Sequence, residues 1–135
     1  MKETERRFLA SRELCHLATA SSDGIPQVTP VIYAMDGNNV IIATDYGTRK
    51  LKNLRENRNA SLVVDNYHPN RAVIIQGTCE IFESGKEYLQ LLQILFARFK
   101  FYRENPWGEG EAPILKVTPS KVVSWGLTPK GKKRR

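Results

Sequence analysis

Residues 17–34 read LATASSDGIPQVTPVIYA, and their pattern is the first indication of the fold class of this chain. Residues 17–20 have strand character, and residues 21–24 (SSDG) favour a tight turn because glycine tolerates positive φ. Residues 27–35 are rich in β-branched and aromatic side chains, which favour a strand. The stretch therefore predicts a β-hairpin.

Pro30 restricts where the second strand of this hairpin can lie. Proline has no backbone N–H to donate to a neighbouring strand, so we expect an edge strand or a bulge at this position. Residues 36–39 (DGNN) predict another turn, and residues 40–44 predict a third strand. The three strands are expected to form a meander.

The remaining chain alternates strand patterns with helical ones. Helices are predicted over residues 3–14, 48–57 and 86–103, the last from apolar side chains that recur every three or four positions. Strands are predicted over residues 60–65, 72–82, 114–117 and 122–125, with a bulge or a close backbone approach at Gly77. Because the βαβ alternation of parallel sheets is missing, we expect a mainly β fold, a small antiparallel barrel with a few helices.

The positive charge of the chain is unevenly placed. The 135 residues carry a formal net charge of +7. Five of those charges come from the last six residues, and removing them leaves a net charge of +2; they are Lys130, Lys132, Lys133, Arg134 and Arg135. We therefore expect one domain over residues 1–127 and a disordered basic tail over residues 128–135, without a specific nucleic-acid partner.

The first residues lack the apolar centre of a secretory signal, and no apolar stretch is long enough to span a bilayer. We therefore expect a cytoplasmic protein without a membrane partner. Cys15 and Cys79 are the only cysteines, and two thiols in an intracellular chain are expected to be buried and unbridged.

Motifs of metal-dependent and nucleophilic catalysis are missing. His16 and His68 are the only histidines, and neither has a cysteine or carboxylate at zinc-ligand spacing, so no metal site is predicted. No Gly-x-Ser-x-Gly motif occurs, and Gly108-Glu109-Gly110 lacks the preceding strand and the third glycine of a dinucleotide-binding fingerprint. We therefore assign no catalytic side chain.

Residues 43–50 (ATDYGTRK) contain the parts that would suit a phosphate group. Thr44 ends a predicted strand, Gly47 frees the turn, and a helix opens with Thr48, Arg49 and Lys50. The N-terminus of a helix offers unpaired amides, arginine offers a planar fork and lysine a point charge. The alternative for this segment is a capped, solvated surface helix.

Four segments in order, residues 17–34, 40–65, 73–83 and 114–126, resemble the FMN-binding split-barrel family related to pyridoxamine 5'-phosphate oxidase. The resemblance spans roughly residues 8–126. It implies a six-stranded antiparallel split β-barrel that forms a homodimer, with two flavins bound in clefts between the subunits.

The resemblance also implies which residues bind the cofactor. The strand that passes the isoalloxazine ring would be Val28, Thr29, Pro30 and Val31. The phosphate would be held by Thr44, Thr48, Arg49 and Lys50. Gln76 and Trp125 occupy positions from which members of the family contact the flavin of the other subunit, although an ordinary strand residue and an ordinary core aromatic are the alternatives for these two.

The resemblance implies an FMN-dependent oxidoreductase of unknown small-molecule substrate. The longer vitamin B6 oxidase holds its substrate with an arginine and a histidine near its C-terminus, whereas no histidine follows His68 here, so pyridoxamine phosphate is not the expected substrate. Three alternatives stay open. Residues 50–54 (KLKNL) resemble a segment of related reductases that use the deazaflavin coenzyme F420, a non-catalytic flavin or haem carrier could use the same cleft, and a nucleic-acid-binding barrel could use the basic tail.

Overall fold

The computed structural model describes residues 1–128, and the predicted tail, 128–135, lies outside the described residues except for its first position. The strands are β1 (Leu14–Ala20), β2 (Pro26–Ile32), β3 (Ala34–Asp36), β4 (Asn39–Ala43), β5 (Asn59–Asn66), β6 (Arg71–Phe82) and β7 (Ile114–Trp125). The helices are α1 (Glu3–Ala10), α2 (Arg49–Glu56), α3 (Lys86–Arg98) and α4 (Lys100–Glu104).

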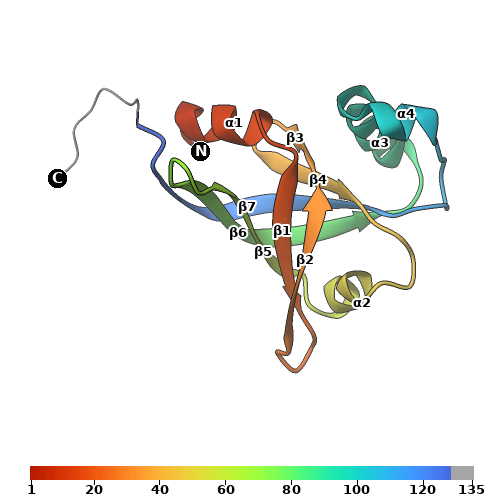
Figure 1. The fold of residues 1–135 in the computed structure, drawn as a ribbon. Helices are drawn as coiled ribbons and strands as arrows, with labels where there is room; N and C mark the ends of the chain where they lie inside the picture. The colour runs from red at the N-terminus through yellow and green to blue at the C-terminus, as the bar shows by residue number, and fades with distance from the viewer. Residues whose placement is uncertain (129–135) are drawn as a thin grey trace.

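The described strands form one antiparallel sheet in the order β2-β1-β5-β6-β7-β4-β3. The sheet is curled, so that β1 and β2 cross in front of β6 and β7 in Figure 1. The predicted mainly β fold is confirmed, as a curled antiparallel half-barrel with few helices. The described part of the chain has seven strands in place of the six expected.

The additional strand arises at Tyr33, which divides the predicted strand 27–35 into β2 and β3. The backbone N–H of Tyr33 donates to the carbonyl of Glu13 at 3.0 Å, and its buried hydroxyl donates to the carbonyl of Leu9 at 2.5 Å. These bonds anchor the point at which the chain leaves β2, after which β3 pairs with β4. The predicted meander holds in part: the predicted second strand pairs with β1 through β2 and with β4 through β3, but the two halves lie at opposite edges of the sheet and β4 also pairs with β7.

The hairpin and the edge position of Pro30 are confirmed. β1 and β2 pair with His16 opposite Pro30, and β2 is the terminal strand of the sheet. In the connecting turn Gly24 has a φ of 88°, and its N–H donates to the carbonyl of Ser21 at 3.0 Å. Glycine meets this left-handed conformation without a Cβ clash.

The predicted bulge at Gly77 is also confirmed. The β6–β7 register shifts there, with Gly77 opposite Pro119 and Gln76 opposite Lys121, so Ser120 is the extra residue. The two strands predicted over 114–117 and 122–125 are therefore one strand, β7, that contains the irregularity. A Cβ added to Gly77 would overlap the carbonyl oxygen of Thr118.

Two of the predicted helices end earlier than their sequence patterns. α1 ends at Ala10, because the chain enters β1 at Leu14. The helix predicted over 86–103 is interrupted at Phe99, which has the extended dihedrals φ −122° and ψ 116° and separates α3 from α4. The Phe99 side chain is buried, which indicates that packing overrides the helical periodicity at this position.

Two apolar clusters hold the fold together. One fills the inside of the curled sheet beneath α1, with Leu9, Leu17, Val64 and Ile75 fully or almost fully buried. The other lies between α3 and the strands β3, β4 and β7.

Cys15 and Cys79 are buried and free, as predicted, and burial raises the pKa of both thiols to about 12. Within residues 1–128 no helix has the length and apolar character needed to cross a bilayer.

Gly77→Ala should destabilise the protein, because the new Cβ would collide with rigid backbone of β7. Clashes in packed regions cost about 1–3 kcal/mol in the free energy of unfolding, and a backbone clash belongs at the upper end. Urea unfolding monitored by circular dichroism measures this loss. Gly108→Ala is the matched control, since nothing lies within 4 Å of an added Cβ there, and equal stability of the two variants would contradict the expectation.

Candidate functional site

The predicted phosphate-binding residues lie where β4 ends and α2 begins. Thr44 is buried, and its N–H donates to the carbonyl of Pro113 at 3.0 Å, which ties the end of β4 to the residue before β7. The chain then turns through Gly47, whose φ is 82°. The hydroxyls of Thr44 and Thr48 lie 3.4 Å apart, so the turn brings the two predicted hydroxyl ligands together.

Thr48 caps α2 as predicted. Its hydroxyl oxygen accepts from the N–H of Leu51 at 3.4 Å, and its hydroxyl lies 3.1 Å from the carbonyl oxygen of Asp45, to which it donates. This arrangement satisfies one of the amides that a helix leaves unpaired at its start. The remaining amides of the first turn keep the partial positive charge of a helix N-terminus.

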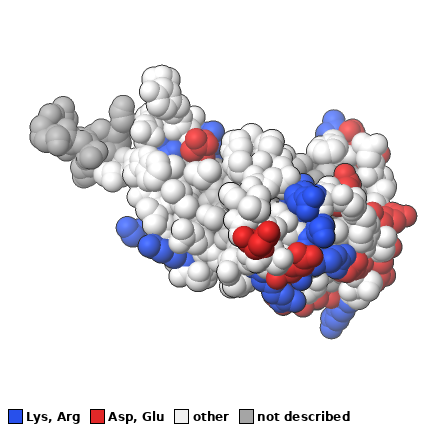
Figure 2. Space-filling view, turned by 90° about the horizontal axis from the view of Figure 1, so that it is seen from below, with Lys and Arg blue, Asp and Glu red and all other residues white. Residues whose placement is uncertain are grey.

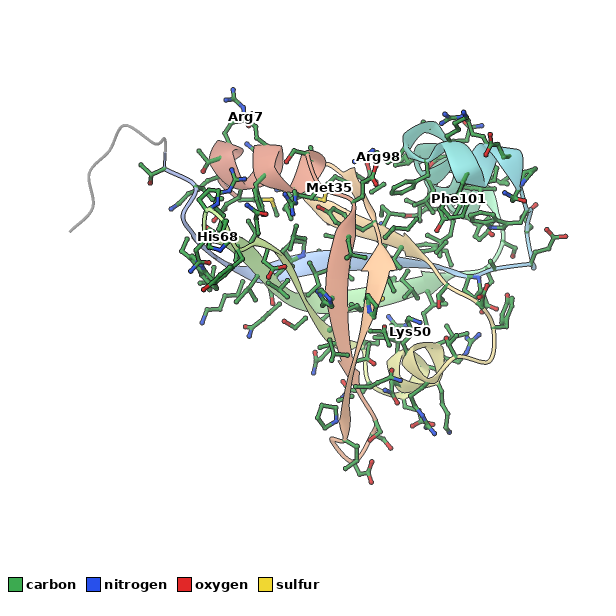
Figure 3. All side chains as sticks on the ribbon, in the orientation of Figure 1. Arg7, Met35, Lys50, His68, Arg98 and Phe101 are labelled. Atoms are coloured by element: carbon green, nitrogen blue, oxygen red, sulfur yellow. The ribbon has the colours of Figure 1, made fainter. Side chains whose placement is uncertain are left out.

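A pocket of about 300 Å³ brings together three of the four predicted phosphate ligands. We call it the Lys50 pocket, and its lining residues are Ala43, Thr44, Asp45, Thr48, Lys50, Tyr102, Trp107 and Ala112. Figure 3 shows Lys50 on the side of α2 that faces the sheet. The Lys50 side chain is half-buried and supplies the positive charge of the pocket.

Arg49, the fourth predicted ligand, is exposed and does not line the Lys50 pocket. It lines two neighbouring cavities: one of about 480 Å³ that Gln27 and Asn53 also line, and one of about 520 Å³ that Thr48 also lines. The two cations thus flank the start of α2 on different sides. In Figure 2, Lys and Arg side chains lie beside Asp and Glu side chains over the part of the surface seen from below.

The first turn of α2 is electrostatically unusual. It contains Arg49 and Lys50 but no acidic residue, and neither cation forms an ion pair with another side chain among residues 1–128. A helix macrodipole favours anions at this end and disfavours cations. An anion bound in front of the helix would attract both the helix end and the two cations and so offset this cost, which makes the segment suited to a phosphate group.

The opposite wall of the Lys50 pocket is aromatic, and the sequence analysis did not identify it. The rings of Tyr102 and Trp107 lie 4.8 Å apart and meet edge to face at 90°. The indole N–H of Trp107 donates to the hydroxyl of Tyr88 at 3.0 Å, and Tyr88 in turn donates to the carbonyl of Ala112 at 2.6 Å. The wall is therefore held by a partly buried chain of hydrogen bonds. Burial, with a smaller contribution from Asp45, raises the pKa of Tyr102, so its phenol stays protonated.

The strand predicted to pass the flavin ring, Val28–Val31, lies within β2 at the open edge of the sheet. Its alternate side chains face opposite directions: Val31 packs against the core, whereas Val28 is exposed. β2 also contacts β4 without pairing with it.

Two buried polar atoms of β2, Oγ1 of Thr29 and Oε1 of Gln27, have no hydrogen-bond partner among residues 1–128. Such orphaned polar atoms are rare in folded proteins and are suited to a polar ligand.

Gln76 and Trp125, the two residues predicted to reach a second subunit, are not at the Lys50 pocket. Gln76 lines a separate cavity of about 370 Å³ with Thr19 and Ser120. Trp125 is 45% exposed, and its indole N–H donates to Asn70 at 3.1 Å. A role for either residue in cofactor binding stays a prediction.

Both residues belong to the outer face of the sheet, opposite the buried core. Residues that pair across five neighbouring strands form a largely apolar row on this face, namely Pro30, His16, Val63, Ile74 and Val123. Large apolar side chains in or beside this row are strongly exposed, with Leu14 at 50%, Val28 at 61% and Val123 at 43%. A contiguous exposed apolar surface marks an interaction site more often than a solvent-facing one.

The sequence profile of a family described as pyridoxamine 5'-phosphate oxidase matches residues 1–126. Among solved structures, the haem storage protein HutZ from Vibrio cholerae is 15% identical, with a TM-score of 0.78 over 90% of this chain and 92% of that one. An FAD-binding protein from Mesorhizobium loti is 21% identical, with a TM-score of 0.73 over 92% and 91%. A protein named F420 reductase is 24% identical, with a TM-score of 0.68 over 91% and 98%. At these identities the likeness shows the fold, and the three proteins are named for three different ligands.

Thr48→Ala should destabilise the cofactor-free protein by about 1 kcal/mol, because the first turn of α2 loses its side-chain cap. Thr48→Ser keeps the hydroxyl and should leave the free energy of unfolding almost unchanged. Urea unfolding of both variants beside the wild type measures the difference. Equal stability of the alanine and serine variants would show that Thr48 does not act as a cap.

Proposed function

We propose that this chain, which belongs to the pyridoxamine 5'-phosphate oxidase family, binds FMN between two copies of itself and uses it in an oxidoreductase reaction on a small molecule. The family membership confirms the resemblance seen in the sequence. The observation that carries the proposal is the Lys50 pocket, where two hydroxyls and one cation converge at the start of a helix that has no acidic residue in its first turn.

In this proposal the phosphate of FMN is held by groups of three kinds. The hydroxyl of Thr44 donates a hydrogen bond, and the hydroxyl of Thr48 donates to the phosphate in exchange for its bond to the Asp45 carbonyl. The free amides of the α2 first turn add further donors, and Lys50 supplies a point charge. Arg49, which lines the neighbouring cavities, is proposed to turn toward the phosphate so that its planar fork binds the oxygens. The electrostatic cost of two cations in one helix first turn is then offset by the bound anion.

The ring of FMN is proposed to lie along β2. That strand presents an unpaired backbone edge, because Pro30 and its neighbours pair with β1 on one side and end the sheet on the other. Thr29 and Gln27 add buried polar atoms that lack a partner among the described residues. When bound, FMN supplies hydride-transfer chemistry, and the protein need only orient the ring and leave one face open. No acid or base side chain is required for that role.

A second copy of the chain is proposed to cover the outer sheet face. Covering it would bury the row that includes Val63, Ile74 and Val123, and such burial drives the association of stable dimers. Gln76 and Trp125 lie on this same face, so a dimer would present them to the partner. This placement supports their predicted role as contacts to the flavin of the other subunit.

Replacing both Arg49 and Lys50 with alanine should remove most of the flavin. Each charge-assisted hydrogen bond contributes about 1.5–3 kcal/mol, so the dissociation constant for FMN should rise about a hundredfold or more. The measurements are titration of the protein with FMN and the absorbance spectrum of the purified complex. A two-banded spectrum identifies a flavin, whose mass after release distinguishes FMN from FAD, whereas a single deazaflavin band or a haem Soret band supports the corresponding alternative.

Lys52→Ala is the matched control, because Lys52 lies on the same helix and already pairs with Glu56 at 3.5 Å. It should keep full flavin stoichiometry. Retention of full stoichiometry by the Arg49→Ala/Lys50→Ala variant would remove the proposed phosphate site.

Val123→Glu should convert the dimer into a monomer and lower flavin occupancy with it, since a charge would be buried in the apolar row. Sedimentation velocity measures the oligomeric state directly. Leu89→Glu is the control: Leu89 is similarly exposed, at 44%, but lies on α3 away from the sheet face. A wild type that sediments as a monomer at micromolar concentration would contradict the proposed dimer.

A further inference from the structure

Glu83, the residue that follows β6, makes polar contacts with three separate segments. One carboxylate oxygen accepts from the hydroxyl of Tyr46 at 2.8 Å. The other accepts from the guanidinium of Arg55 at 3.2 Å, which is also an ion pair. The backbone carbonyl of Glu83 accepts from the N–H of Gly110 at 3.0 Å.

These contacts reach both walls of the Lys50 pocket. Tyr46 belongs to the turn between Thr44 and Thr48, which supplies the hydroxyl wall, and Arg55 lies in the last turn of α2. Gly110 belongs to residues 105–113, the segment that carries Trp107 and Ala112 on the aromatic wall. Glu83 therefore connects two segments that are far apart in sequence and face each other across the pocket.

The link to the aromatic wall is reinforced beside Glu83. The carboxylate of Glu109 accepts from the N–H of Gly85 at 2.5 Å, so a second bond joins residues 83–85 to the same loop. The carboxylate of Glu111 accepts from the N–H of Gly108 at 2.8 Å and closes the loop on itself. A shift of Glu83 relative to α2 would therefore change the width of the pocket.

We propose that Glu83 is a positioning residue for the Lys50 pocket: it holds the Tyr46 turn and α2 against the aromatic wall, so that Thr44, Thr48 and Lys50 converge on one phosphate. The inference rests on the proposed function, because it assumes that the pocket receives the phosphate of FMN. Glu83 itself does not line the pocket and acts only through its three partners.

The contribution of Glu83 to global stability should be small. The side chains of Arg55 and Glu83 are 45% and 41% exposed, and solvent screening leaves exposed ion pairs with little net effect on unfolding. Hydrogen bonds from Arg55 and then Tyr46 lower the pKa of the Glu83 carboxyl, so the carboxylate stays charged and acts as acceptor for both. A network of this kind orders the local geometry more than it stabilises the whole fold.

The test compares Glu83→Gln with Glu80→Gln. Glu80 is an exposed carboxylate on β6, three residues earlier, and its ion pair, with Lys116 at 3.9 Å, lies outside the Lys50 pocket. In the cofactor-free protein Glu83→Gln should speed amide hydrogen exchange over residues 44–50, because it weakens the carboxylate contacts and keeps the backbone bond to Gly110. In titrations it should raise the dissociation constant for FMN about tenfold, while the melting temperature changes by about 2 °C or less. Glu80→Gln should change neither exchange nor affinity.

Tyr46→Phe provides a second route if Glu83→Gln folds poorly, since it deletes one hydroxyl from the network. The double variant Tyr46→Phe/Glu83→Gln should bind FMN about as weakly as Glu83→Gln alone, because the two groups act as one unit. Fully additive losses, unchanged FMN affinity, or unchanged exchange would each overturn the positioning role. If the wild type takes up no FMN, the proposed function falls and this inference with it; if only the variants behave like the wild type, the inference falls alone.

Discussion

The antiparallel pairing of β4 with β7 is the constraint on which the rest of the molecule depends. β7 pairs with β6 on one side and with β4 on the other, and so joins the two halves of the sheet. The same pairing carries the chain before β7 to the end of β4, where the N–H of Thr44 donates to the carbonyl of Pro113 at 3.0 Å. Without it the hydroxyl and aromatic walls of the Lys50 pocket would not face each other.

Features of the fold that depend on local chemistry could be predicted from the sequence, and features that depend on distant pairing could not. Pro30 indicated an edge strand and Gly77 a bulge, because each residue type limits its own backbone. Tyr33 and Phe99 broke predicted elements, because their buried rings meet partners that no local window contains. The meander was predicted only in part for a related reason: its two consecutive pairings form, but periodicity did not indicate that β4 also pairs with β7.

The candidate site likewise has one part that local sequence predicted and one part that depends on distant pairing. Thr44, Thr48 and Lys50 lie within seven consecutive residues, so their convergence could be predicted from one segment. Tyr102 and Trp107 follow α3 in the sequence, and the pairing of β4 with β7 brings them to the pocket. Their distance in sequence from Thr44 gives no indication of this contact. The fold itself does not choose the ligand, as proteins named for haem, FAD and F420 share it. The fold therefore leaves the choice of ligand to the side chains of each protein.

The two terminal strands of the sheet bear on how the molecule avoids fibril formation. An open sheet edge is a template on which a strand of another molecule can add, and repeated addition leads to aggregates. Here one edge is β3, only three residues long, and the other is β2, which contains Pro26 and Pro30. Prolines interrupt the row of N–H donors that an incoming strand would need. The chain can thus leave a backbone edge open without offering a continuous template for polymerisation.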